Sequence, residues 1–214
     1  MNNYSESILS DLNNLKYFKR QLTHEEIIDV LSDIKHRIFP RPFERLTKLS
    51  NRENLVGVEI GVAGGEHALS ILENLNIQKL YLIDPYDLYD TYTEGKNIYG
   101  ITQETLEKTE KSARKKLKNY EKQIVWIKKL SSQAISDIKE DLDFAYIDGN
   151  HAYSFVLEDL NNYYKLLSPN GVIGGHDYYN GFAKDHSGVV KAVQEFAVKN
   201  NLNLTVELPD FWFE

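Results

Sequence analysis

The residues of this sequence that could do chemistry come directly after short apolar runs. Asp148 and His151 end one run within YIDGNHAY, and His176 and Asp177 end another within VIGGHDYY. Aspartate oxygens are good ligands for hard divalent cations, and histidine is the most frequent general base near neutral pH. The pattern indicates a cation bound by carboxylates beside an imidazole that accepts a proton.

The two run ends are expected to be neighbours in a parallel sheet. The chain between Asp148 and Asp177 is long enough for a crossover helix and a return strand, and paired strands lie about 4.8 Å apart. Two carboxylates that close repel each other, and a divalent cation removes the repulsion. We therefore expect Asp148, His176 and Asp177 as metal ligands, with Mg²⁺ favoured over Mn²⁺. Asp148 and His151 form the expected catalytic pair, with His151 as the general base.

A glycine turn follows the first apolar run, in VEIGVAGGEHALSIL. Glycine is needed where backbone takes positive φ or approaches a ligand closely, and the N-terminus of the helix expected behind the turn favours an anionic group. The residues expected to bind a cofactor here are Glu59, Gly61, Val62, Gly64 and Gly65.

The turn suits S-adenosylmethionine better than a dinucleotide. A dinucleotide fingerprint that starts at Gly61 needs glycine where the chain has Ala63 and Glu66, and an acid at the helix start repels a pyrophosphate. S-adenosylmethionine carries no phosphate. Asp84, which ends the second apolar run, is placed to accept hydrogen bonds from both ribose hydroxyls.

Three further residues are candidates for the same site. Ser131 and Ser132 follow the third run and are expected to contact the adenine edge, with helix capping as the alternative interpretation. Asp148 is expected to border the cofactor as well as the metal. His67 is the third histidine that follows a predicted strand end, and a core histidine is the alternative interpretation for each of the three.

The elements that must position these residues alternate between apolar runs and helical stretches. Continuous apolar runs predict strands buried on both faces, and alternation with helices predicts a parallel α/β sheet of the Rossmann-like class. The ending LNLTVELPDFWFE predicts a hairpin that adds an antiparallel strand. The runs are LVGVEI (55–60), KLYLID (79–84), QIVWIK (123–128), LDFAYID (142–148) and GVIGG (171–175).

Residues 1–50 are predicted to be a helical extension that precedes a domain at 51–214. Thr23 and Glu26 form a capping box, and PRPF ends the helical pattern. The extension would either cap the active site or pair subunits in a homo-oligomer. The tyrosine-rich segment at 86–101 is predicted to be a lid.

Composition excludes several classes of protein. The net charge of −7 argues against nucleic-acid binding, and no stretch approaches the roughly 18 apolar residues that a membrane span needs. The absence of cysteine rules out disulfides and thiolate metal sites. The start of the chain lacks the basic-then-apolar order of a signal peptide, so a cytoplasmic location is expected.

The motifs together resemble class I S-adenosylmethionine-dependent methyltransferases, from Leu55 to the C-terminus. The nearer resemblance is to metal-dependent small-molecule O-methyltransferases of the macrocin O-methyltransferase kind, with a more distant one to catechol O-methyltransferase. It rests on VEIGVAGGEHALSIL, LYLIDPY, DFAYIDGNHAYSFVLEDL, LLSPNGVIGGHDY and GVVKAVQEF, of which YIDGNHAY followed by LLSPNGVIGGHDY is the most specific part.

The resemblance implies a seven-stranded sheet whose last strand runs antiparallel, with helices on both faces. It implies that the acceptor is a hydroxyl of a sugar or of a sugar-containing small molecule. The sequence departs from the family's pattern at His176, where the pattern commonly has an acid. The roles that the resemblance implies are metal ligands for Asp148 and Asp177, the general base for His151, and cofactor contacts for Glu59, Gly61 and Asp84.

Two other functions are weighed against an O-methyltransferase. A nicotinamide-dependent oxidoreductase is disfavoured by Ala63 and Glu66. A non-catalytic Rossmann-like binding protein is disfavoured by the clustering of Asp148, His151 and Asp177.

Overall fold

The structure is a computed structural model, and it describes Thr23, Ile27, Leu31 and residues 40–89, 101–179 and 187–213. The predicted helix in the N-terminal extension and most of the predicted lid therefore lie outside the described residues. None of the helices in the described ranges is long and apolar enough to cross a membrane.

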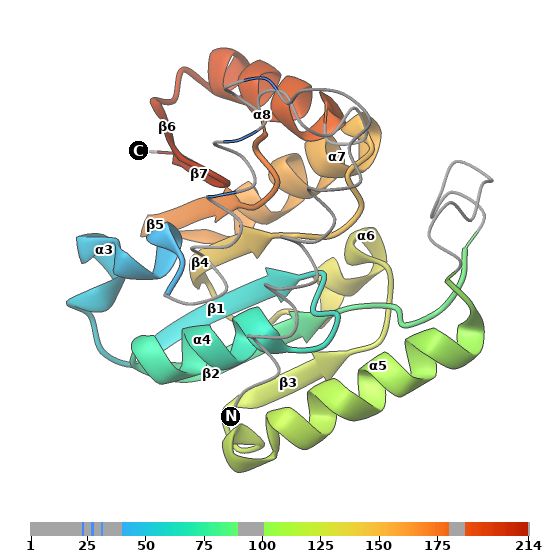
Figure 1. Cartoon of the computed structure of the whole chain (residues 1–214). Coiled ribbons are helices and arrows are strands. Elements are labelled where there is room, and N and C mark those ends of the chain that lie inside the picture. The colour runs from blue at the N-terminus through green and yellow to red at the C-terminus, as the bar shows by residue number, and fades with distance from the viewer. Residues whose placement is uncertain are drawn as a thin grey trace.

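The predicted α/β fold is confirmed by a seven-stranded sheet in the order β3-β2-β1-β4-β5-β7-β6 (Figure 1). The strands from β1 to β5 pair in parallel, and β7 runs antiparallel to both β5 and β6, as predicted for the last strand. The strands are β1 (Leu55–Ile60), β2 (Ile77–Ile83), β3 (Ile124–Ile127), β4 (Leu142–Ile147), β5 (Leu167–Gly175), β6 (Leu204–Glu207) and β7 (Asp210–Phe213).

Helices cover both faces of this sheet. Buried side chains of η1, α3, α4 and the end of α5 pack on one face, and those of α6, α7 and α8 pack on the other. The helices are η1 (Pro42–Arg45), α3 (Thr47–Ser50), α4 (Glu66–Asn74), α5 (Gln103–Lys116), η2 (Lys118–Tyr120), α6 (Ser131–Ala134), η3 (Ile135–Asp137), α7 (Tyr153–Tyr163), η4 (Tyr164–Leu166) and α8 (Ser187–Asn200).

The chain order reverses between β1 and β4, which are neighbours in the sheet. From β1 the chain continues outward to β2 and β3, whereas from β4 it continues to β5 on the other side. Ligands of open α/β sheets bind beyond the carboxyl ends of the strands at such a switch point. The loops that follow β1 and β4 are therefore where a site is expected.

The segment around η1 packs closely on one face of the sheet. The Phe43 side chain is fully buried, with ring centroids 6.1 Å from Phe144 and 5.0 Å from Tyr146. Gly174 makes room for it, because a Cβ at Gly174 would stand 2.7 Å from the Phe43 ring and 2.3 Å from the backbone oxygen of Phe211. The absence of a side chain at Gly174 of β5 therefore determines where η1 can pack.

Gly174→Ala is expected to lower the free energy of unfolding by about 2 kcal/mol, because the backbone of β7 cannot move away from an added methyl group. Urea unfolding measures the loss. Gly149→Ala is the matched control, since its Cβ would meet only Ile60 Cγ2, at 3.3 Å. Equal unfolding midpoints for the two variants would contradict the packing described for Gly174.

Candidate active site

The glycine turn after β1 lies directly against the tip of β4. Gly61 has a φ of +85°, and a Cβ at this position would stand 1.9 Å from the backbone oxygen of Asp148. The Asp148 N–H donates to the oxygen of Ile60 at 2.8 Å. A side chain at position 61 would therefore push the two tips apart, which explains the glycine.

Asp84 holds this turn to the end of β2. Its Oδ2 accepts hydrogen bonds from the N–H groups of Val62 at 3.1 Å and Ala63 at 3.0 Å, and its Oδ1 accepts from Tyr86 N–H at 2.9 Å. Burial raises the pKa of the Asp84 carboxyl, although the three backbone donors oppose that shift. The structure thus places Asp84 beside the turn, as the sequence predicted, and in addition gives it a structural role there.

The second half of the turn is tied to α5. Gly65 is the N-cap residue of α4, with a left-handed φ of +76°. Lys116 donates to the Gly64 oxygen at 2.8 Å and pairs with the Glu66 carboxylate. The acid at the helix start is therefore balanced by a lysine that is distant in the chain.

Glu59 is buried beneath the turn in a cluster of charged side chains. His67 of α4 lies between two carboxylates, with Nδ1 3.1 Å from Glu59 Oε1 and Nε2 2.9 Å from Glu44 Oε1. The second contact is an ion pair that lacks hydrogen-bond alignment, and Glu59 Oε2 has no hydrogen-bond partner. Burial and the Arg41 guanidinium lower the pKa of His67, but the two carboxylates outweigh them and raise it to about 9.

The two serines after β3 are the first residues of α6. Leu130 is the N-cap residue of this helix, so capping by a serine side chain does not account for them. The Ser131 oxygen accepts a hydrogen bond from the Tyr163 hydroxyl at 2.7 Å, and Ser132 is exposed. Asp159 of α7 is buried beside Ser131, and this burial raises its pKa to about 7 against the opposing hydrogen bond from Ser131.

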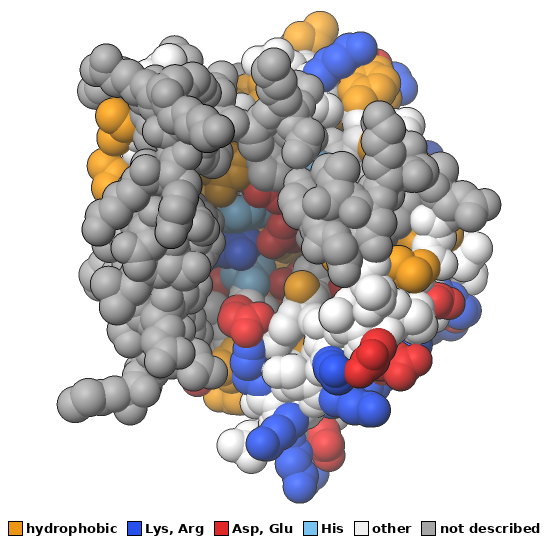
Figure 2. All heavy atoms as spheres, turned by 45° about the vertical axis from the view of Figure 1, so that its right-hand side comes forward, with side chains coloured by type: hydrophobic (Ala, Val, Ile, Leu, Met, Phe, Trp, Pro, Cys, Tyr) orange, Lys and Arg blue, Asp and Glu red, His pale blue; other side chains and the backbone are white. Residues whose placement is uncertain are grey.

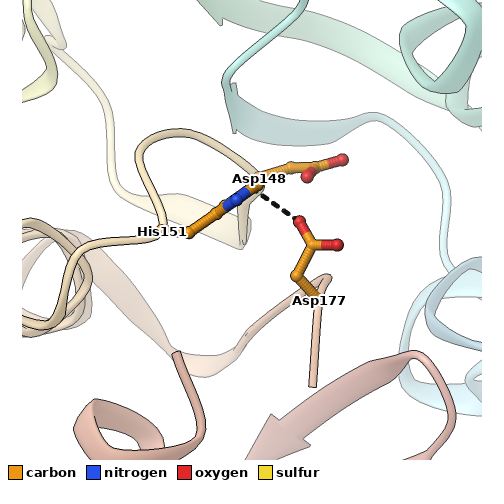
Figure 3. Close-up of side chains that lie close together, drawn as sticks. All are labelled: Asp148, His151 and Asp177. Atoms are coloured by element: carbon orange, nitrogen blue, oxygen red, sulfur yellow. Dashed lines mark ion pairs between the residues drawn. The ribbon is translucent and has the colours of Figure 1, made fainter. Parts of the chain in front are cut away.

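The tips of β4 and β5 are parallel neighbours, as predicted, with Ile147 paired to Gly175. His151 Nε2 lies 2.8 Å from Asp177 Oδ2, the contact that Figure 3 draws as a dashed line. Asp177 has a φ of +63°, a left-handed backbone that is uncommon outside glycine and frequent at functional sites.

His176 occupies the other oxygen of the same carboxylate. Its Nδ1 lies 3.1 Å from Asp177 Oδ1 and 3.8 Å from Asp148 Oδ1. Burial and Arg41 lower the pKa of His176, but Asp177 and Asp148 outweigh them and raise it. Burial would raise the pKa of Asp177, yet the two histidines hold it well below its usual range. Asp177 is therefore ionised and paired with imidazoles.

Arg41 is a part of this site that the sequence did not reveal. Its Nη1 donates to Asp148 Oδ2 at 3.0 Å and to the Tyr146 hydroxyl at 2.7 Å. The Tyr146 hydroxyl in turn donates to Asp210 at 2.8 Å. The sequence pattern of PRPF indicates only the end of a helix. No spacing rule connects position 41 with position 148.

The side chains at the two tips lie close enough to share a cation. One ligand atom each of Asp148, His151 and Asp177 lies within 4.8 Å of the others. This set contains His151 where the sequence predicted His176, although His176 borders both carboxylates. Figure 2 shows acidic, basic and histidine side chains gathered together near the centre of this face. A pocket here is lined by Asp148, Asn150, His151, His176, Asp177 and Phe211 among others.

Residues 58–178 match the sequence family described as a methyltransferase domain. An uncharacterized protein of Acanthamoeba polyphaga mimivirus is 29% identical over 158 residues, which are 68% of this chain. The aligned part is 64% of that protein, so the chain spans less than two thirds of the relative's length.

Two solved structures share the fold. A proposed caffeoyl-CoA O-methyltransferase from Staphylococcus aureus is 17% identical with a TM-score of 0.57, covering 96% of this chain and 99% of its own. The O-methyltransferase NovP is 18% identical with a TM-score of 0.56, covering 77% of this chain and 73% of its own.

The buried charge of His67 predicts a pH dependence of stability. Because its pKa is raised from 6.5 to about 9 in the folded protein, the stabilisation is complete below pH 6.5 and is lost as the pH rises through 9. The free energy of unfolding should fall by about 3 kcal/mol between pH 6.5 and 9.5. Urea unfolding of the wild type and of His67→Gln across this range measures it. If both proteins showed the same fall, the imidazolium would not be its source.

Proposed function

The chain belongs to the methyltransferase domain family, and we propose that it is an O-methyltransferase that acts on a hydroxyl of a sugar or a sugar-containing small molecule. Family membership supports S-adenosylmethionine as the methyl donor. The observation that carries the proposal is the contact between the glycine turn of β1 and the β4 tip, since it puts the turn against Asp148, three residues before His151.

The cradle fits the cofactor in two respects. Glu59 beneath the turn has a buried carboxylate oxygen without a hydrogen-bond partner. When bound, S-adenosylmethionine supplies a methyl group on a positively charged sulfur that departs as neutral S-adenosylhomocysteine. Three backbone donors leave one of the roughly four acceptor sites of the Asp84 carboxylate, so Asp84 can accept from one ribose hydroxyl while it holds the turn.

His151 is the general base in this proposal. It takes the proton of the acceptor hydroxyl, and Asp177 at 2.8 Å stabilises the imidazolium that forms. The rest of the catalysis is positioning, because the donor is already activated by its charge. The rigid β1 and β4 tips, in contact at Gly61, are suited to that task.

A divalent cation is part of the proposal, with Asp148 and Asp177 as its carboxylate ligands and His176 at their side. The donor set fits Mg²⁺ or Mn²⁺, because carboxylate oxygens come together from two strand tips. When bound, the cation would lower the pKa of the acceptor hydroxyl. Arg41 already contacts one oxygen of Asp148, so a cation at this site would meet a carboxylate that is already paired.

The sugar acceptor is supported by the aromatic and amide groups near His151. Tyr89, at the start of the tyrosine-rich segment, has its ring centroid 6.2 Å from that of Phe155, and Asn150 donates to the Tyr89 hydroxyl at 3.3 Å. Aromatic faces with hydroxyl and amide groups beside them combine apolar contact with hydrogen bonding. This combination suits a ring that carries hydroxyl groups.

Asp84→Ala is expected to weaken S-adenosylmethionine binding by about tenfold or more, because it removes the acceptor for the ribose and loosens the turn. Calorimetry measures the affinity, and thermal unfolding without cofactor separates it from a loss of fold. Asp87→Ala, an exposed acid in the same loop, is the control. Unchanged affinity in Asp84→Ala would remove the ribose role.

His151→Ala is expected to lower kcat by about 100-fold, with the affinities for S-adenosylmethionine and Mn²⁺ unchanged, because it removes only the base. Release of S-adenosylhomocysteine with a panel of sugar acceptors measures kcat, and Ser154→Ala on the exposed side of α7 is the control. A near-normal kcat would disprove the base role. Loss of Mn²⁺ affinity would instead identify His151 as a metal ligand.

A further inference from the structure

We propose that Arg41 competes with the divalent cation for Asp148, so that cation binding moves the Arg41 guanidinium off the Asp148 carboxylate and loosens the hydrogen bond that holds the Phe43 amide. This inference rests on the proposed function for the existence of a cation site. It adds a residue outside the family-matched region 58–178 that sets the cation affinity and links it to the packing of η1.

The contact between Arg41 and Asp148 is a direct and partly buried ion pair. The distance from Nη1 to Oδ2 is 3.0 Å, and the two side chains are only 19% and 18% exposed. Solvent and salt screen such a pair less than a surface pair, so the guanidinium meets much of the charge requirement of this carboxylate. A cation that binds Asp148 must therefore replace an existing interaction and does not meet a bare carboxylate.

Sharing Asp148 between the two cations is unfavourable. The candidate ligand atoms of Asp148, His151 and Asp177 lie within 4.8 Å of one another, so a bound cation would lie close to the Arg41 guanidinium. Two positive charges at such a separation repel strongly where water is largely excluded. The repulsion disappears when Arg41 leaves Asp148. Substitution of Arg41 should therefore tighten cation binding.

Arg41 has other partners that it can keep when it leaves Asp148. Its guanidinium also donates to the Tyr146 hydroxyl and lies 5.5 Å from the centroid of that ring. Tyr146 bonds the buried Asp210, whose other oxygen accepts the Phe43 N–H at 3.3 Å. The acid at position 210 thus connects the guanidinium to the backbone of η1. A shift of Arg41 would be transmitted to the Phe43 amide through these bonds.

The test is Mn²⁺ binding to the full chain, measured by calorimetry in the presence of S-adenosylhomocysteine. Arg41→Gln is expected to bind Mn²⁺ at least tenfold more tightly than the wild type. The matched control is Arg45→Gln in the same segment, where Arg45 pairs with Glu207 at 2.7 Å and both side chains are about half exposed. It should change the affinity less than twofold. Equal or weaker binding by Arg41→Gln overturns the proposal, as does the absence of Mn²⁺ binding in both proteins.

A second measurement needs no substitution at Arg41. Mn²⁺ added to the wild type should speed hydrogen exchange of the Phe43 amide at least threefold, and it should have no such effect on Asp148→Asn. Unchanged or slower exchange in the wild type overturns the proposal. Binding of S-adenosylhomocysteine, measured in the same samples, separates a failure of the proposed competition from a failure of the proposed methyltransferase function. If that ligand binds while Mn²⁺ leaves Arg41 in place, methyl transfer stands and the competition is wrong.

Discussion

The parallel pairing of β4 with β1 on one side and β5 on the other is the constraint on which the site depends. Strand ends that pair in register must present their following residues at one edge of the sheet. Asp148 therefore meets Gly61 across one pairing and lies beside Asp177 across the other. A shift of β4 by one residue would turn its alternate side chains to the opposite faces. The chemistry at the tips thus depends on the pairing of this strand.

Side chains beneath and beside the strand tips supply the positive charges that compensate the buried carboxylates. Burying a carboxylate is costly unless a partner compensates it, and beneath the β1 tip Glu59 meets His67, which also faces Glu44. At the β4 tip the compensating charge comes from Arg41. Both Glu44 and Arg41 belong to the short segment around η1. The segment that places Phe43 in the hydrophobic core therefore also supplies the arginine that balances Asp148.

Local sequence patterns predicted the strands and the residues at their tips, but not the partners of those residues. The apolar run at 55–60 coincides with β1, and the hairpin at the end of the chain was recognised from its turn. The strand at the predicted run 171–175 begins earlier, at Leu167, where it pairs with Leu142 of β4. Arg41 could not be predicted, because its role depends on a contact across the whole fold. Hydrophobic periodicity predicts which face of an element is buried, but it gives no information about ion pairs between distant segments.

The hydrogen bond between the Phe43 amide and Asp210 joins positions separated by 167 residues. During synthesis from the N-terminus, a segment whose partner has not yet been made has nothing to pack on, and contacts between distant positions form slowly. Asp148 is therefore synthesised before Asp210 of the C-terminal hairpin, which holds η1 through the Phe43 amide. The site therefore depends on residues from both ends of the described ranges, because Asp210 holds the Phe43 amide and Phe211 of the same strand lines the pocket.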